Sequence, residues 1–160
     1  MKYIKSLTIY KEPFNGRIIH INSGRPLPYG STETPDGFNF SLMSKNAKRV
    51  TLVISTLSDS EPLIEIVFDH NIHRTGDVWH LCIANLPPQF CYMYRVSGLY
   101  EPEKGHYFNS EKMLIDPYAK ALTRSNVWQI NKSIKNNSDS HWRCFIPQTD
   151  FDWEGDVPIN

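Results

Sequence analysis

Residues 78–98, VWHLCIANLPPQFCYMYRVSG, decide the fold class of this chain. A turn at Pro87-Pro88 separates two runs in which every second residue is large and apolar. The apolar faces consist of Trp79, Leu81 and Ile83 in the first run and Tyr92, Tyr94 and Val96 in the second. Successive side chains of a β-strand point to opposite sides, so this alternation is typical of strands with one buried face. The stretch predicts two strands that cover a hydrophobic core.

Three upstream runs show the same alternation. They are residues 37–44, 49–55 and 63–69, with apolar faces made by Phe38, Phe40 and Leu42, by Val50, Leu52 and Ile54, and by Ile64, Ile66 and Phe68. In the first run Asn39 and Ser41 lie on the other face, which a half-buried strand leaves to solvent. No segment from 36 to 98 has a helical period, and a parallel sheet would need helical crossovers. We therefore predict an all-β antiparallel sandwich of two sheets packed face to face.

Size and charge narrow the function classes. At 160 residues the chain suits one domain plus an extension, because a large catalytic barrel alone takes roughly 250 residues. Lys+Arg and Asp+Glu both number 17, so the net charge is zero and no basic footprint for nucleic acid or anionic lipid is present. No stretch approaches a membrane span. A cytoplasmic protein without nucleic-acid or membrane partners is the expectation.

The cysteines and histidines do not suggest a metal or another cofactor. Cys82, Cys91 and Cys144 are an odd number without CxxC spacing, which predicts buried free thiols. Asp69, His70 and His73 follow a predicted strand without a fourth ligand in view. We expect them to be solvated turn residues, with no cofactor bound.

Residues 98–122, GLYEPEKGHYFNSEKMLIDPYAKAL, contain the residue types of an active site. The pairs Glu101 and Glu103, or Glu111 and Asp116, could act as the two carboxyls of a glycosidase, which lie about 5–5.5 Å apart in retaining enzymes. The Pro/Gly-rich frame instead predicts exposed loop carboxylates and no catalytic residue. Asp116 precedes a proline and fits a turn in which its carboxylate accepts a local backbone N–H.

Several stretches resemble one known family in the same order along the chain. GHYFNSEKMLIDPYAKAL (105–122) is similar to the pattern GHRFNPxKLLLDPYAKAL, and TGDVWHLCIANLPPQFCYMYRVSGLYEP (75–102) to the strands that precede it. GRPLPYGSTETPDGFNFSLMSKNAKRVTLVI (24–54) resembles the entry into the first strands, and FDWEGD (151–156) a motif just before a catalytic barrel. The family is that of the isoamylase-type glycogen debranching enzymes in the alpha-amylase superfamily.

The resemblance implies a domain organisation and a function. Residues 1–23 would be a lead-in, 24–105 an immunoglobulin-like sandwich of carbohydrate-binding module family 48, and 106–160 an irregular connector toward a catalytic barrel absent from this chain. That barrel would hydrolyse α-1,6 branch linkages in glycogen-type glucans and would carry all catalytic residues of the parent enzyme. The chain itself would be non-catalytic, with the barrel and α-glucan (glycogen or malto-oligosaccharide) as its partners.

The resemblance also points to a sugar contact. Glycogen-binding members of the module family present two exposed tryptophans. The first position would fall near Leu57–Ser60, where no aromatic residue occurs, and the second near Tyr100. Tyr100 is the candidate substrate-binding residue, with packing on a partner domain as the open alternative. Trp79 is expected in the core rather than stacked on a sugar.

Docking to a partner domain is predicted for several residues of the connector. The run 113–122 would be unusually apolar as a free surface, and large apolar residues recur near the chain's end. The candidates are His106, Tyr107, Leu114, Asp116, Tyr118, Leu122, Phe151 and Trp153. His106 would order its loop by bonding to backbone, while Tyr107 and Phe108 cover an apolar seam. The alternatives to this function are an autonomous glycogen-binding module, a β-sandwich protein-interaction domain and a small hydrolase.

Overall fold

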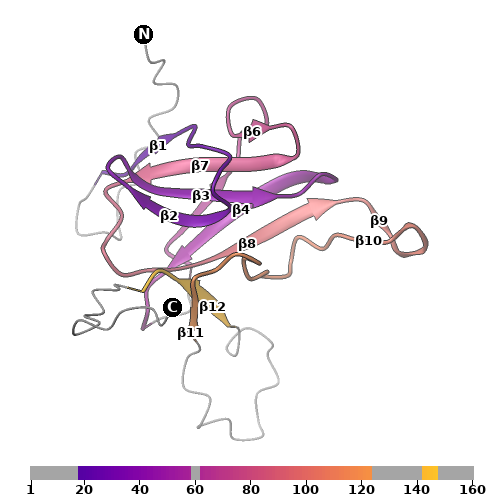
Figure 1. Cartoon of the computed structure of the whole chain (residues 1–160). Coiled ribbons are helices and arrows are strands. Elements are labelled where there is room, and N and C mark those ends of the chain that lie inside the picture. The colour runs from indigo at the N-terminus through magenta and orange to yellow at the C-terminus, as the bar shows by residue number, and fades with distance from the viewer. Residues whose placement is uncertain (1–17, 59–61, 124–141, 148–160) are drawn as a thin grey trace, which may run out of the picture.

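The computed structural model describes residues 18–58, 62–123 and 142–147, so the docking candidates Phe151 and Trp153 lie outside the described residues. Figure 1 shows two layers of strands. One sheet has the order β1 (His20–Asn22), β7 (Val78–Ala84), β3 (Gly37–Met43) and β2 (Gly30–Thr34), with β6 (Arg74–Thr75) also paired to β7. The other has the order β11 (Ala121–Thr123), β12 (Arg143–Phe145), β8 (Cys91–Gly98), β4 (Ala47–Ser55) and β5 (Ile64–Val67).

The predicted all-β antiparallel sandwich is confirmed. Each of the five predicted runs contains a strand, and every strand pairing among the described residues is antiparallel. The core lies between the two sheets and includes Trp79, which is completely buried as expected. Its largest members are Trp79, Tyr92, Tyr94, Phe40, Ile19, Leu52, Ile54, Leu81, Ile83 and Val50. Alternating apolar residues therefore build the core that the sequence indicates.

The outer face of β3 and β7 is covered, which corrects the expectation of a solvent-facing side for Asn39 and Ser41. Both side chains are buried. The Asn39 side chain accepts from the N–H of Arg25 at 2.7 Å and donates to its carbonyl at 3.0 Å, while Ser41 Oγ donates to the Pro26 carbonyl at 2.6 Å. His80 on the same face lies 2.6 Å from the Ser23 carbonyl. Residues 23–26 thus cover these strands, and their backbone satisfies the polar side chains beneath.

Strands also occur on both sides of residues 24–105, the predicted module boundaries. β1 pairs with β7, and β11 and β12 extend the second sheet beyond β8. A small hairpin of β9 (Tyr100–Glu101) and β10 (His106–Tyr107), closed by the 3-10 helix η1 (Pro102–Lys104), projects from the end of β8 (Figure 1). The two sheets therefore include strands that lie before and after residues 24–105 in the sequence.

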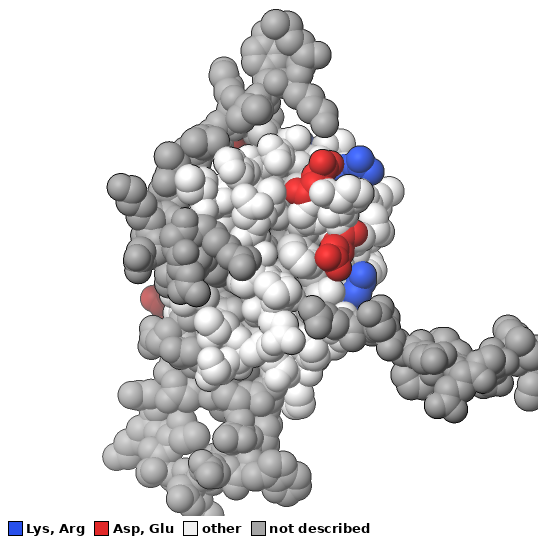
Figure 2. All heavy atoms as spheres, turned by 90° about the vertical axis from the view of Figure 1, so that its left-hand side faces the viewer, with Lys and Arg blue, Asp and Glu red and all other residues white. Residues whose placement is uncertain are grey.

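The surface in Figure 2 contains few charged side chains among its described residues, and acidic groups lie close to basic ones there. The described residues contain no helix long and apolar enough to cross a membrane.

Gly30 allows the connector to lie directly against β2. Its φ is +85°, and a Cβ at this position would lie 2.6 Å from the Tyr118 carbonyl oxygen. We expect Gly30→Ala to lower the free energy of unfolding by about 2–4 kcal/mol, because left-handed strain adds to a backbone clash. Urea denaturation would measure this. Gly76→Ala is the control, since Gly76 has φ +60° but nothing within 4 Å of its added Cβ, so only strain of about 1 kcal/mol remains. Equal losses in both variants would contradict the close approach.

Candidate functional site

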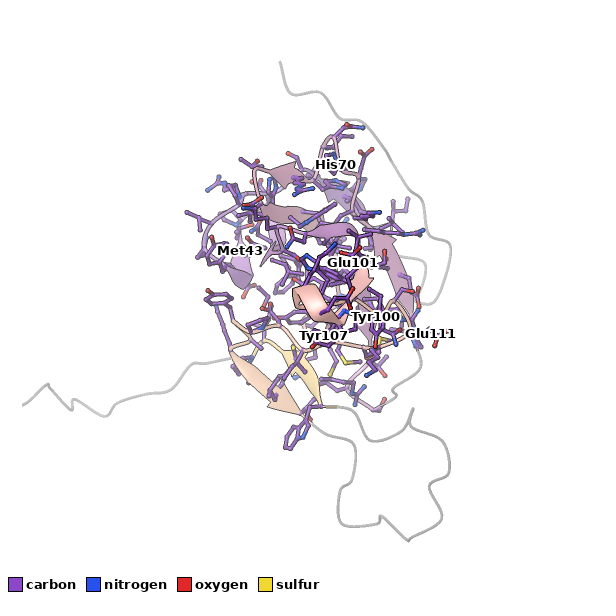
Figure 3. All side chains as sticks on the ribbon, turned by 90° about the vertical axis from the view of Figure 1, so that its right-hand side faces the viewer. Met43, His70, Tyr100, Glu101, Tyr107 and Glu111 are labelled. Atoms are coloured by element: carbon purple, nitrogen blue, oxygen red, sulfur yellow. The ribbon has the colours of Figure 1, made fainter. Side chains whose placement is uncertain are left out.

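The hairpin β9–β10 presents two aromatic rings to solvent. Tyr100 and Tyr107 are opposite one another in the pairing and are 67% and 66% exposed. Their ring centroids lie 6.5 Å apart with the planes nearly perpendicular, and both side chains lie on the end of the molecule seen in Figure 3. The hairpin bends back because Gly105, at φ +78°, ends η1 in the left-handed conformation. The predicted sugar contact and one predicted docking residue are therefore direct neighbours.

The carboxylates of this hairpin are surface groups. Glu101 Oε2 forms an ion pair of 3.0 Å with Lys104 Nζ, and Glu103 and Glu111 are exposed. Figure 3 shows Glu101 and Glu111 on the same end of the molecule as the two tyrosines. The acid of a glycosidase works from a desolvated site, whereas Glu101 is partly exposed and ion-paired and the other two groups are exposed. The arrangement favours a binding role over a catalytic one.

His106 lies in the hairpin, and Phe108 follows directly after β10. Their rings stack with centroids 6.5 Å apart, and Phe108 packs against the main core. A Cβ on Gly98 would meet the Phe108 ring at 2.6 Å, so glycine is required at the end of β8. Phe108 covers an apolar seam as predicted, whereas Tyr107 is exposed. The predicted bond from the His106 ring to backbone stays a prediction.

An exposed apolar surface continues along the connector, and we call it the connector surface. It consists of Leu114, Ile115, Tyr118 and Leu122, which are 42–52% exposed. The Tyr118 ring lies 5.0 Å from that of Tyr29, and the Tyr29 hydroxyl contacts Met43 Sδ at 3.9 Å. Sequence reasoning did not include Tyr29, Met43 or the exposed Trp142 in this region. In the sequence, only Gly30 beside Tyr29 could have indicated that the backbone of Tyr118 lies close to β2.

Asp116 lies beneath the connector surface and is only 3% exposed. Its Oδ1 accepts the N–H of Tyr118 at 2.8 Å, so the predicted turn is confirmed. The Tyr92 hydroxyl donates to Oδ2 at 3.0 Å and also lies 3.0 Å from Ser31 Oγ. Burial raises the pKa of Asp116, while the hydrogen bonds from Tyr118 and Tyr92 oppose that rise. Asp116 therefore holds the connector in place from below and offers almost no surface to a partner.

Two further polar groups of the core lie near Asp116. Cys144 Sγ accepts the Asp116 N–H at 3.2 Å, and burial raises the pKa of this thiol to about 11. The Tyr94 hydroxyl is buried without a hydrogen-bond partner among the described residues, and burial raises its pKa well above the ordinary value. The thiols of Cys82, Cys91 and Cys144 are free and buried, as predicted. These groups are part of the packed interior and do not form an open site.

The turn after β5 differs from the expectation of solvated residues. His73 is buried, and its Nδ1 accepts the N–H of Asp69 at 2.9 Å. Burial lowers the pKa of His73, although Asp69 opposes this shift. His70 is exposed and contacts Arg74 at 2.9 Å. Among the described residues no three His, Cys, Asp or Glu side chains are grouped so that they could hold a metal ion.

The two platform positions implied by the family resemblance lie at opposite ends of the second sheet. Ser55 pairs with Cys91 and Ala47 with Gly98, so Leu57 follows one end of β4 while Tyr100 follows the other end of β8. Eight residues at about 3.3 Å each separate these ends by roughly 25 Å. Tyr100 and the region of Leu57 therefore do not form one joint sugar platform.

A groove lies between the turn after β3 and the loop that follows the hairpin. It has a volume of about 380 Å³ and is lined by Ser44, Lys45, Asn46, Val96, Gly105, His106, Tyr107, Phe108, Asn109, Lys112 and Leu114. A more apolar hollow of about 190 Å³ shares Ser44, Val96, Phe108 and Leu114 with it and extends to Ile115 and Pro117. The groove therefore joins the hairpin to the connector surface.

Comparisons with known proteins agree with the resemblance. Residues 28–119 match the family described as carbohydrate-binding module 48 (isoamylase N-terminal domain). Isoamylase 1, chloroplastic, of Arabidopsis thaliana is 34% identical over 97% of this chain and 20% of its own length. The glycogen debranching enzyme of Yersinia enterocolitica is 36% identical over 85% of this chain and 21% of its own length. The apo pullulanase structure from Paenibacillus barengoltzii is 22% identical, with a TM-score of 0.48 over 64% of this chain and 14% of that one. The chain spans about a fifth of the length of the curated relatives.

Proposed function

Because the chain belongs to carbohydrate-binding module family 48, the isoamylase N-terminal domains, we propose that it is the non-catalytic N-terminal module of a glycogen debranching enzyme. The observation that carries this proposal is the family match over residues 28–119 together with relatives named as isoamylase and glycogen debranching enzyme. Hydrolysis of α-1,6 branch linkages would belong to a catalytic barrel in the same polypeptide. A cytoplasmic location is part of the same proposal.

The module would position the barrel through the connector surface. Leu114, Tyr118 and Leu122 expose apolar area that a partner domain would remove from water, which is the main favourable term in such contacts. The connector is fixed for this purpose, because Leu114 and Tyr94 exchange backbone hydrogen bonds of 2.9 and 2.8 Å. Asp116 holds the following turn. A rigid surface loses little conformational entropy on docking.

Tyr100 would serve as the sugar contact of the module. Its ring is two-thirds exposed and projects on the hairpin, where one face can stack on a pyranose ring. Its distance from the Leu57 end of the sheet supports a single-platform contact with α-glucan.

The debranching proposal is tested on the natural full-length polypeptide. Branch-linkage hydrolysis is assayed as new reducing ends released from amylopectin, and we expect activity from a barrel that follows this module. A natural polypeptide without such a barrel, or one that leaves branch linkages intact, would refute the proposal.

Docking predicts a specific effect of the connector surface on the full-length protein. We expect the double variant Leu114→Ser/Tyr118→Ala to separate the unfolding of the two domains into two calorimetric transitions, because it removes apolar contacts between them. Val67→Ser is the matched control, since Val67 on β5 is 43% exposed like Leu114 but lies on the edge strand of the second sheet. Two transitions in the control and a single one in the double variant would count against docking here.

A further inference from the structure

Hydrogen bonds to backbone groups order both rims of the groove beside the hairpin. The first rim is the turn Ser44–Asn46. Ser44 donates its N–H to the Asp77 carbonyl at 2.9 Å and accepts the indole N–H of Trp79 at 3.1 Å. The Lys45 carbonyl accepts Arg74 Nη2 at 3.0 Å. This rim is therefore tied to β6, β7 and the turn between them.

The opposite rim is ordered by its own turn. The side-chain oxygen of Asn109 accepts the N–H of Glu111 at 2.9 Å, and the backbone carbonyl of Asn109 accepts the N–H of Lys112 at 3.2 Å. The floor between the rims consists of Val96, Phe108 and Leu114, which belong to the sandwich or contact it. A groove with two ordered rims can bind a ligand without first paying the cost of ordering its walls.

The side chains of the groove match the chemistry of a sugar. Asn46, Asn109 and Ser44 can both donate and accept hydrogen bonds, as sugar hydroxyls do. Lys45 and Lys112 add ammonium donors, and none of the described residues that line the groove is a carboxylate. Tyr107 supplies an exposed ring at the edge, where the apolar face of a pyranose can stack.

The size and position of the groove also fit an oligosaccharide. Its volume of about 380 Å³ lies within the range of ligand clefts. The Tyr100 ring, 6.5 Å from Tyr107, extends the aromatic surface beyond the groove. The neighbouring hollow toward Ile115 and Pro117 is lined mainly by apolar residues and suits a protein partner better. The polar groove suited to a sugar and the apolar hollow suited to a protein partner therefore adjoin one another on one surface.

We propose that this groove is a second subsite for an α-linked malto-oligosaccharide, continuous with Tyr100 and adjoining the connector surface. Tyr107 stacks on one glucosyl ring, while Lys45, Asn46 and Lys112 donate hydrogen bonds to hydroxyls of the chain. The assignment of the ligand as α-glucan rests on the proposed function. A glucan held here lies beside the surface that would meet the catalytic barrel, so the subsite would guide a branch chain toward the cleft.

The test is a titration of the 160-residue chain with maltohexaose, followed by the backbone amide signals of the groove and by calorimetry. We expect signals of residues 44–46 and 105–112 to shift, and Tyr107→Ala to weaken binding about tenfold, which corresponds to about 1.4 kcal/mol. Tyr107→Phe should retain most of the affinity because it keeps the ring. Trp142→Ala is the control, since it removes an exposed aromatic side chain outside the groove.

Three outcomes would overturn the subsite. The first is the absence of binding at tens of millimolar maltohexaose, and the second is equal weakening by Trp142→Ala and Tyr107→Ala. The third is displacement of the sugar by inorganic phosphate at matched ionic strength, which would indicate an anion site made by Lys45 and Lys112. Branch-linkage hydrolysis by the full-length protein is measured separately, so failure of the subsite is distinguishable from failure of the debranching proposal.

Discussion

Replacement of Asp116 by alanine is expected to lower the free energy of unfolding by about 3 kcal/mol, measured by urea denaturation. The variant loses the hydrogen bond to the Tyr118 N–H and leaves the buried Tyr92 hydroxyl without its carboxylate acceptor. The turn under the connector surface then loses its side-chain support and keeps the backbone bond from the Ala119 N–H to the carbonyl of residue 116, which is 3.1 Å long. A loss below about 1 kcal/mol, the net value of one ordinary hydrogen bond, would contradict this role.

Asp116→Asn separates the charge from the geometry. An asparagine keeps an oxygen for the Tyr118 N–H but cannot ionise. Burial raises the folded-state pKa of Asp116, so folding favours the protonated form, and the stability that this group contributes is greatest below its unfolded pKa of about 3.9. That contribution is lost as the pH rises through the raised folded pKa.

The pH dependence therefore has a definite sign. The stability of the wild type relative to Asp116→Asn should fall as the pH rises from about 3 to neutrality and then stay constant. Denaturation curves at several pH values would measure the difference. A relative stability that instead increases with pH would mean that hydrogen bonds to the carboxylate outweigh its burial.

Replacement of Arg143 by alanine is expected to cost about 3–4 kcal/mol. Arg143 is 1% exposed, and its guanidinium donates to the carbonyls of Thr56 and Leu57 at 2.8 and 2.9 Å and to Ser55 Oγ at 3.3 Å. These bonds join β12 to the end of β4 across more than 85 residues of sequence. Hydrogen bonds from a charged donor are stronger than neutral ones, and their carbonyl acceptors would lose them.

Arg95→Ala is the control for the Arg143 prediction. Arg95 pairs with Glu65 at 2.7 Å, but both side chains are about a third or more exposed. An ion pair of this kind contributes about 0–1 kcal/mol. Thermal and urea unfolding of the two variants should therefore differ clearly. Similar losses would show that the buried guanidinium does not anchor β12.

Much of the fold could be predicted because strand alternation is a local property. Within each run the apolar residues recur at period two, as Phe38, Phe40 and Leu42 do, and the turn residues between the runs exclude long helices. The same local reasoning predicted the Asp116 turn, since the carboxylate and the N–H that it accepts are two residues apart. The family resemblance likewise rests on short motifs with set spacing.

The candidate site could be predicted only in part. Sequence reasoning selected Tyr100, Tyr107 and the apolar connector, and these residues do lie on the surface, but it did not foresee the groove. That groove forms where the turn at Ser44 faces the loop at Asn109, and nothing in either segment indicates the other. The burial of His73 was missed for the same reason, because packing around the turn after β5 determines it.

The sequence by itself determined that this chain is an antiparallel β-sandwich whose motifs resemble those of the isoamylase N-terminal type. Only the tertiary structure decided that Asn39 and Ser41 are buried, that Asp116 supports the connector from below, and that Leu57 and Tyr100 lie far apart. The physical reason is the range of the forces involved. Side-chain alternation and turn chemistry act between neighbours in the chain, whereas burial, pKa and the walls of a groove depend on segments that folding brings together.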